Sequence, residues 1–188
     1  MLDAYLPFFS GKYGEEVEFI VVINGSTDST ERVVEEYKRR YTCLTTVVDP
    51  NPIGKGGALI KGFRVATGDL IGFVDADGST PPAAFQDLVD KIGDNDGIIA
   101  SRWRKGANVS PSQPLFRLIA SRCFNFIARI MFGLKFADSQ CGAKLFCKDA
   151  IKNILPHLGI TKWAFDVDLL FQFKRLGYVI KEIPTEWH

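Results

Sequence analysis

Two aspartates, Asp75 and Asp77, follow an apolar run at residues 71–74 and precede Gly-Ser-Thr-Pro-Pro. Carboxylate oxygens are ligands that Mg²⁺ and Mn²⁺ prefer, and one or two of them suffice when phosphate oxygens and waters complete the shell. The tripeptide Asp75-Ala76-Asp77 could therefore hold a divalent metal ion against a phosphate. It could equally form a solvated turn, because two aspartates in a turn are common.

A third interpretation is a phosphatase of the haloacid dehalogenase kind, since an apolar strand followed by Asp-X-Asp-Gly-Ser also matches that class. There Asp75 would be the nucleophile. That motif normally lies near the start of its domain, and the later sequence offers no convincing acidic cluster to complete its metal site. We therefore rank this interpretation below the metal-phosphate one.

Three glycine-bearing turns adjoin predicted strands, and their sequences are NGSTD (24–28), PIGKGG (52–57) and DADGS (75–79). Glycine leaves backbone amides unhindered, so such turns can approach phosphates closely. Simple chain reversal explains any one of them. Three such turns that converge on one sheet edge favour a phosphate site. At that site Lys55 would either add positive charge or remain solvated.

The segment 114–133 is predicted to be an amphipathic helix. On a helical wheel its apolar residues form one broad arc: Phe116, Ile119, Phe126, Ile127, Ile130 and Met131. The polar residues Arg117, Ser121 and Asn125 align on the other side, and Arg122 and Arg129 form a second polar stripe. Two placements fit this pattern, a core-packed helix with a solvated polar face or a helix lying at a membrane surface.

Strands are predicted at 17–23, 44–48, 70–74, 97–100 and within the alternating tail 178–187, with helices between them. Helix starts are indicated by Asp28 with Glu31, spaced as in a capping box, and by Pro81-Pro82. The alternation predicts an α/β fold, a mostly parallel sheet with helices on both faces. Such sheets bind ligands at the carboxyl ends of their strands, where Asp75 and Asp77 would lie.

The bulk composition bounds the remaining possibilities. With 188 residues and 46% hydrophobic residues, the chain is predicted to form a single domain over 1–188. A formal net charge of +1 argues against nucleic-acid binding. The four cysteines lack CxxC spacing, which indicates free thiols in a reducing compartment. With no long apolar stretch and no basic leader, we expect a cytoplasmic protein.

Five segments together resemble family 2 glycosyltransferases of the GT-A fold. They are VEFIVVINGSTDST, NPIGKGGALIKGFRVATGDLIGFVDADGS, IIASRWRKG, SQCGAKLF and FDVDLLFQFKRLGYVIKEIPTEW, and the likeness spans roughly residues 17–187. GKGGA and SQCGAKLF are most similar to the dolichyl-phosphate glucosyltransferase branch of the polyprenyl-phosphate enzymes. The resemblance implies a Rossmann-like sheet. It also implies an inverting transfer of a sugar, glucose from UDP-glucose, to dolichyl or another polyprenyl phosphate.

The resemblance also assigns roles to individual residues. Mg²⁺ or Mn²⁺ would bind Asp77 directly and Asp75 would contact metal or ribose, so that the metal stabilises negative charge on the departing diphosphate. The remaining nucleotide-sugar contacts would come from Asn24, Gly25, Ser26, Lys55 and Ala76. The acceptor phosphate would meet Arg102, Arg117 and Ser121, at a peripheral contact with the cytosolic membrane face.

The acceptor decides whether catalysis needs a base. A phosphomonoester is mostly ionised near neutral pH, so an in-line displacement needs alignment and little or no general base. A sugar hydroxyl would need a carboxylate base, for which Asp168 or Asp166 in FDVDLL is the candidate. Both aspartates could instead stabilise a helix N-terminus. The predicted catalytic residues are therefore Asp75, Asp77 and Asp168.

Two departures from the family pattern bear on activity. Members normally begin with a central strand ending in a Pro-X-Tyr-Asn-Glu-like turn, whereas residues 1–16 resemble the helix and loop that follow it. We expect a truncated chain, direct pairing of the neighbouring strands, or another segment in the gap. Ile23-Asn24 also replaces a more polar pair, and Ile23 cannot hydrogen-bond a base. A non-catalytic domain therefore remains an alternative.

Overall fold

The computed structural model describes residues 1–110, 115–159, 162 and 164–188, without the side chains of 115 and 117–120. Its longer helices are α1 (Leu2–Tyr13), α2 (Thr30–Lys38), α3 (Gly54–Val65), α4 (Pro82–Lys91), α5 (Leu115–Phe132), α6 (Lys148–Ile154) and α7 (Phe165–Arg175). Its strands are β1 (Phe19–Asn24), β2 (Leu44–Asp49), β3 (Leu70–Val74), β4 (Gly97–Ser101), β5 (Asn108–Val109), β6 (Ala143–Cys147), β7 (Ile180–Pro184) and β8 (Glu186–Trp187).

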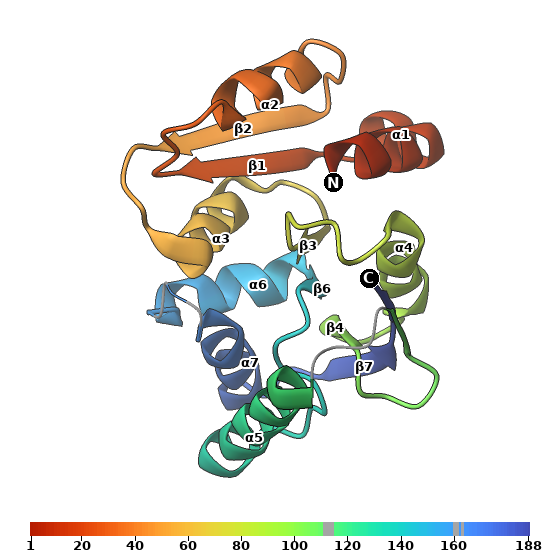
Figure 1. The fold of residues 1–188 in the computed structure, drawn as a ribbon, viewed down its shortest axis with the longest axis vertical. Helices are drawn as coiled ribbons and strands as arrows, with labels where there is room; N and C mark the ends of the chain where they lie inside the picture. The colour runs from red at the N-terminus through yellow and green to blue at the C-terminus, as the bar shows by residue number, and fades with distance from the viewer. Residues whose placement is uncertain (111–114, 160–161, 163) are drawn as a thin grey trace.

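β1 and β2 form a parallel pair that begins at Phe19 opposite Leu44 and ends at Asn24 opposite Asp49. Helices α1 and α2 accompany this pair at the top of Figure 1. A small cluster holds them together: Leu6 of α1, Val34 of α2, and Ile23 and Leu44 of the strands. We call this part the two-stranded unit.

β3, β6, β4 and β7 form a four-stranded sheet in that order, which puts β7 at an edge. β4 and β7 are parallel, whereas β6 runs antiparallel to both β3 and β4. β6 starts at the edge where β3 and β4 end, since Ala143 pairs with Val74, and it runs back along both strands. The α/β class is confirmed, with a more mixed sheet than the alternation predicted.

Helices cover both faces of the four-stranded sheet (Figure 1). On one face, Leu88 of α4 and Ile92, directly after α4, pack with Ile98 of β4 and Leu145 of β6. On the other, Phe146 of β6 packs with residues of α3, α6 and α7. Adjacent residues of β6 enter opposite clusters, because successive side chains of a strand point to opposite faces.

β1 and β3 lie in separate sheets, so the expectation that the neighbouring strands pair directly is wrong for the described residues. Helix α3 contacts β1, and its Ile60 and Phe63 share a cluster with Ile71 and Phe73 of β3. Side-chain packing on α3 therefore joins the two parts where backbone pairing does not.

The apolar arc of α5 faces outward. Its described residues have exposed fractions of 83% for Phe116, 62% for Phe126, 53% for Ile127, 66% for Ile130 and 69% for Met131. Of the two placements that the sequence left open, the core-packed one is therefore wrong for these residues, because Asn125 and Ala128 take the buried side of the helix. Within the described part of the chain, no helix has the length and apolarity needed to cross a bilayer.

Candidate active site

Asp75 and Asp77 lie directly after β3, at the carboxyl end of the strand, as the sequence predicted. The amide of Asp75 donates to the carbonyl of Gly142 at 3.0 Å, which extends the pairing of β3 with β6 by one residue. The Asp75 carboxylate lies against Gly142 so closely that a Cβ there would overlap it. Asp77 is exposed, and its Oδ1 accepts from the amide of Ser79 at 2.9 Å. Both carboxylates thus border the same turn.

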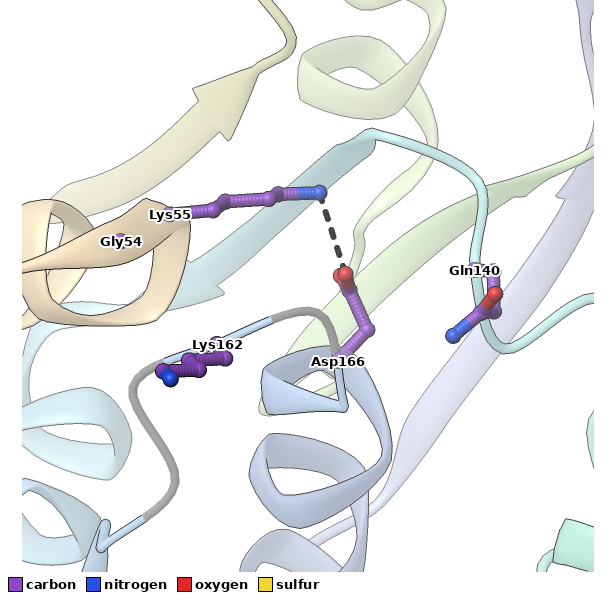
Figure 2. Close-up of a pocket in the computed structure, with 5 residues that line it drawn as sticks. All are labelled: Gly54, Lys55, Gln140, Lys162 and Asp166. Carbon is purple, nitrogen blue, oxygen red and sulfur yellow. Dashed lines mark hydrogen bonds and ion pairs between the residues drawn. The ribbon is translucent and has the colours of Figure 1, made fainter.

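Lys55, at the start of α3, joins Asp75 to Asp166, at the start of α7. Its Nζ lies 2.9 Å from Asp75 Oδ1 and 3.0 Å from Asp166 Oδ2, and Figure 2 shows the contact with Asp166. Burial alone lowers the pKa of Lys55, but Asp166 and Asp75 outweigh it and raise the pKa overall. Lys55 therefore stays protonated and places a positive charge beside Asp75.

A second ammonium group, that of Lys144, contacts Asp166. Lys144 of β6 is fully buried, and its Nζ donates to Asp166 Oδ1 and to the carbonyl of Cys141, each at 2.6 Å. Each oxygen of the Asp166 carboxylate therefore meets one lysine. A buried charge needs such a partner, since isolating it from water costs several kcal/mol.

Lys55 and Asp166 border a pocket of about 400 Å³, which is lined by Gly54, Lys55, Gln140, Lys162 and Asp166 (Figure 2). Lys55, Lys162 and Asp166 all line this pocket, so it presents two lysine side chains and one carboxylate (Figure 2). Such a pocket suits a small polyanion held with a cation.

The turn Asn24-Gly25-Ser26 lies at the end of β1, next to the segment that leads into α3. The amide of Gly25 donates to the carbonyl of Asp49 at 2.9 Å, and a Cβ on Gly25 would come within 2.8 Å of the Pro52 backbone. Gly25 also has a φ of 59°, which favours glycine. Ser26 Oγ donates to Asp28 at 2.8 Å. Packing on Pro52 couples this turn to the helix that carries Lys55.

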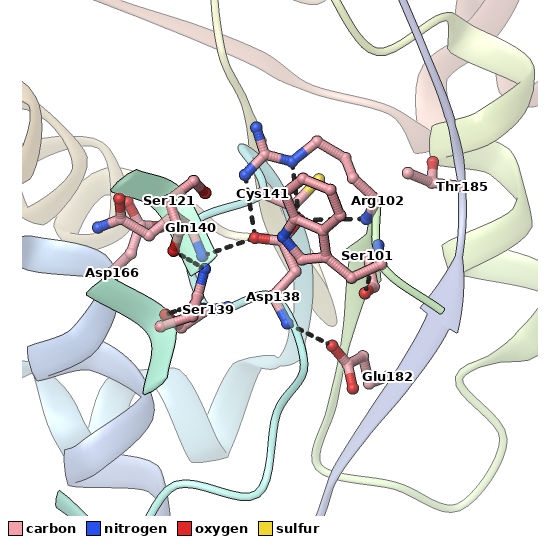
Figure 3. A network of polar contacts seen from close by, with 12 residues as sticks. Ser101, Arg102, Ser121, Asp138, Ser139, Gln140, Cys141, Asp166, Glu182 and Thr185 are labelled. Atoms are coloured by element: carbon pink, nitrogen blue, oxygen red, sulfur yellow. Dashed lines mark hydrogen bonds and ion pairs between the residues drawn. The ribbon is translucent and has the colours of Figure 1, made fainter. Parts of the chain in front are cut away.

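Arg102, which follows β4, belongs to a second polar network, drawn in Figure 3. Its Nε and Nη2 donate to the two oxygens of Asp138 at 2.7 and 3.0 Å. Asp138 is fully buried, and its own amide donates to Glu182 at 2.8 Å. Burial lowers the pKa of Arg102, but Asp138 more than offsets this and the net shift is upward. Asp138 thus orients the guanidinium and leaves Nη1 to other partners.

α5 contributes Ser121 to the surroundings of Arg102 (Figure 3). The side-chain amide of Asn125 donates to the Ser121 carbonyl at 3.0 Å and accepts from Ser139, which ties α5 to the segment before β6. Arg117 lies within α5, but its side chain is outside the described residues, so its predicted role is untested.

A second pocket of about 400 Å³ lies beside α5 and is lined by Trp103, Arg122, Cys123, Asn125, Phe126, Arg129 and Ala137. Arg122 stacks over the Trp103 ring, with its guanidinium carbon 4.2 Å from the ring centroid. This stacking is a cation–π contact and holds the guanidinium at the rim of the pocket.

Asp166 and Asp168 have different surroundings. Asp166 meets Lys55 and Lys144, whereas Asp168 accepts from the amide of Gly159 at 3.1 Å and from Gln172 at 3.0 Å. Asp166 therefore lines the pocket next to Asp75, whereas these contacts of Asp168 are with Gly159, before α7, and with Gln172 of α7.

Comparison with known proteins decides the family. The model of "Glycosyl transferase family 2" matches residues 8–155, which is most of the chain. The chain belongs to glycosyl transferase family 2. The predicted family resemblance is thereby confirmed, and the comparisons lend no support to the haloacid dehalogenase interpretation.

Similar family 2 proteins include dolichyl-phosphate beta-glucosyltransferases. One from Trichomonas vaginalis is 31% identical over 100% of this chain and 59% of its own length. The one from Homo sapiens is 32% identical over 100% of this chain and 62% of its own length. The chain thus spans about three-fifths of these relatives.

A solved structure shares the fold. Glucosyl-3-phosphoglycerate synthase from Mycobacterium tuberculosis, in complex with Mn²⁺, UDP and glucosyl-3-phosphoglycerate, superposes with a TM-score of 0.63. Its sequence is 19% identical, and the match covers 90% of this chain and 59% of that one. This likeness confirms the GT-A fold of the family 2 domain.

Sequence reasoning predicted both partners of the Lys55–Asp75 ion pair as site residues but missed Lys144, which contacts Asp166. Lys144 stands inside the apolar stretch Ala143–Cys147, and a lysine there is a signal of a buried cation that must find a carboxylate. Asp166 is that carboxylate, 22 residues further along the chain.

Proposed function

We propose that this family 2 domain transfers glucose from UDP-glucose to dolichyl or another polyprenyl phosphate at the cytosolic face of a membrane. The observation that carries the proposal is the meeting of Asp75, Lys55 and Asp166 at the carboxyl end of β3. The relatives that align with the whole chain are dolichyl-phosphate beta-glucosyltransferases, which supports the choice of sugar and acceptor.

Asp75 and Asp77 would hold Mg²⁺ or Mn²⁺. The donor set fits, because these ions need few protein carboxylates, and among the described residues no group of three or more His, Cys, Asp or Glu offers an alternative site. When bound, the metal would stabilise negative charge on the departing diphosphate. Gly142 supports this role, since it leaves room for the Asp75 carboxylate.

The donor would lie along the edge from the β1 turn to the pocket of Lys55. Asn24, Gly25 and Ser26 would contact the nucleotide, and the backbone at Ala76 would pass beside it. Lys55 would place its ammonium on the diphosphate, as a compact cation does on phosphate oxygens.

The acceptor phosphate would bind the Nη1 side of Arg102, with Ser121 and Arg117 on α5. Support comes from the bidentate contact of Arg102 with Asp138, which fixes the guanidinium plane. An ionised phosphate oxygen needs no base, and Asp166 is held between two lysines, so alignment is the main task of the protein. Asp168 remains the candidate base if the acceptor is a hydroxyl.

The apolar arc of α5, with Arg122 and Arg129 beside it, would rest on an anionic membrane. Exposed apolar side chains flanked by cations suit a surface that offers both acyl chains and lipid phosphates. A lipid-linked acceptor would then reach Arg102 without leaving the membrane surface.

Transfer is tested with radiolabelled UDP-glucose, Mn²⁺ and a short polyprenyl phosphate. We expect labelled lipid from the wild type and a loss of about 100-fold or more in Asp77→Asn, because the metal would lose a ligand. Asp87→Asn, an exposed aspartate paired with Lys91 on α4, is the matched control. UDP binding without transfer, or no binding by a folded chain, would establish the non-catalytic alternative.

Membrane contact is tested by cosedimentation with vesicles of neutral or anionic lipid. We expect binding to anionic vesicles and a loss of about tenfold or more in the double variant Phe126→Ser, Ile130→Ser. The control Leu176→Ser, Val179→Ser removes exposed apolar side chains elsewhere. Equal sedimentation of both double variants would show that the arc does not contact the membrane.

A further inference from the structure

We propose that Lys55 is a latch on Asp75: its ammonium occupies the carboxylate in the donor-free protein and turns to the diphosphate when metal and nucleotide enter together. The metal and diphosphate in this statement rest on the proposed function. The latch would make the protein bind the metal weakly when the metal is alone and more tightly when the nucleotide binds with it.

The geometry of Asp75 carries the first step. Lys55 Nζ lies 2.9 Å from Asp75 Oδ1, which is the distance of a direct ion pair. The other oxygen of Asp75 lies against Gly142, so Lys55 covers one side of the carboxylate and the backbone confines the other. A divalent ion that approaches Asp75 therefore meets an ammonium already in place.

The second step follows from charge. A metal ion and an ammonium repel each other when both lie within a few ångströms of one carboxylate. A metal that arrives alone displaces Lys55 from Asp75 and leaves it paired with Asp166, which Lys144 also neutralises, whereas a metal that brings a diphosphate supplies a further anion for Lys55. Metal and nucleotide are thus coupled through one side chain, and the coupling must act in both directions.

The third step is the anchor that keeps Lys55 within reach of both partners. Its Nζ lies 3.0 Å from Asp166 (Figure 2). Asp166 is buried and is held by Lys144 at 2.6 Å. Lys55 itself is 34% exposed in its side chain and has a flexible four-carbon stem. It can therefore leave Asp75 while it stays paired with Asp166 at the rim of the pocket.

The experiment measures two affinities that the latch moves in opposite directions. Mn²⁺ binding is followed by electron paramagnetic resonance of the free ion, and UDP binding in the presence of Mn²⁺ by calorimetry. In Lys55→Met we expect Mn²⁺ alone to bind roughly two- to fivefold more tightly, because the competing ion pair is gone. We expect UDP with Mn²⁺ to bind about tenfold more weakly, because a charge-assisted contact is lost.

Two further variants test whether the effect belongs to this ammonium. Lys55→Arg keeps a cation at the position and should restore weak binding of Mn²⁺ alone. Lys61→Met removes a lysine from the same helix that pairs with Asp49, and it should leave both affinities unchanged.

The latch is overturned if Lys55→Met and wild type bind Mn²⁺ alone equally, including the case in which neither binds. It is also overturned if the variant binds UDP with Mn²⁺ as tightly as the wild type. Neither readout depends on sugar transfer. A failure of the transfer assay with intact opposite shifts would reject the proposed function and leave the latch standing.

Discussion

The two-stranded unit and the four-stranded sheet differ in how deeply their strands are buried. All five residues of β4 are buried, whereas Ile23 is the buried residue of β1. The four-stranded sheet has helices on both faces, whereas the two-stranded unit packs against α3 and contains one small apolar cluster. The predicted nucleotide turn at Asn24 thus lies on the more exposed part, and Asp75 lies on the more buried part.

This difference teaches that the proposed donor-binding edge lies across a boundary between two unequally buried parts. Several polar contacts cross it, among them those of Tyr5 and Tyr13 of α1 with Thr80 and Gln86. Glu18, before β1, accepts from the amides of Thr67 and Gly68 at 2.6 and 2.9 Å, and Lys61 of α3 pairs with Asp49 of β2. We therefore expect substitutions in the buried half to cost stability and those at the boundary to change it little.

The largest expected effect is on Lys144. Lys144→Met leaves the Asp166 carboxylate buried without its closest partner and should lower the free energy of unfolding by about 3–5 kcal/mol. Urea unfolding followed by circular dichroism measures this, with Lys38→Met on the two-stranded unit as control. Lys38 pairs with Glu35 at 3.8 Å on the surface, and its loss should cost below about 0.5 kcal/mol. Similar losses of unfolding free energy in both variants would contradict the expected difference between the buried sheet and the two-stranded unit.

The next effect is on Gly142, where the site meets the buried sheet. A Cβ in Gly142→Ala would overlap the Asp75 carboxylate and force it to move. We expect the Mn²⁺-dependent affinity for UDP to fall by about 10- to 100-fold, as when a group that orients a metal ligand is lost. Calorimetry measures it. Gly11→Ala, which meets nothing within 4 Å, is the control, and an unchanged affinity in Gly142→Ala would show that Asp75 tolerates displacement.

A pair of glycines gives the most direct comparison of packing in the two parts. A Cβ on Gly72 of β3 would lie 2.7 Å from the carbonyl oxygen of Lys144, whereas one on Gly62 of α3 would lie 3.4 Å from Val22 of β1. Gly72→Ala should therefore lose about 1–3 kcal/mol of stability. Gly62→Ala should gain up to about 1 kcal/mol from helix propensity. Thermal unfolding checks the signs, and a stabilising Gly72→Ala would refute the difference in packing.

The smallest effect is a pH dependence at the boundary. Burial raises the pKa of Glu18, but hydrogen bonds from Thr67 and Gly68 and the charge of Lys152 outweigh it and lower the pKa. A lowered folded pKa contributes stability above the unfolded pKa, and this contribution is lost as pH falls through the folded pKa. Glu18→Gln should thus lower the free energy of unfolding by less than about 1 kcal/mol at pH 7. This loss should shrink as the pH falls from 5 to 3.

Urea titrations of wild type and Glu18→Gln across that pH range measure the dependence. Glu15→Gln, a neighbouring exposed glutamate, is the control. A difference between wild type and Glu18→Gln that stays constant down to pH 3 would show that the carboxylate does not tie the two parts together.

Local patterns predicted most of the elements. The strand at 70–74 was predicted with the bounds it has, and the strands that became β1, β2 and β4 with small shifts at their ends. β6 was missed, because a five-residue strand with a buried lysine has no clean apolar pattern. The orientation of α5 was also open, since an amphipathic pattern identifies an apolar arc but not what covers it.

The sequence by itself determined the family, the α/β class and the position of Asp75 and Asp77 at a strand end. These follow from turn residues and periodicities that act over a few neighbouring residues. Only the tertiary structure decided that Lys55, Asp75, Lys144 and Asp166 form one chain of charges, and that β1 and β3 do not pair. Long-range ion pairs depend on which elements become neighbours, and the burial that makes them strong exists only after folding.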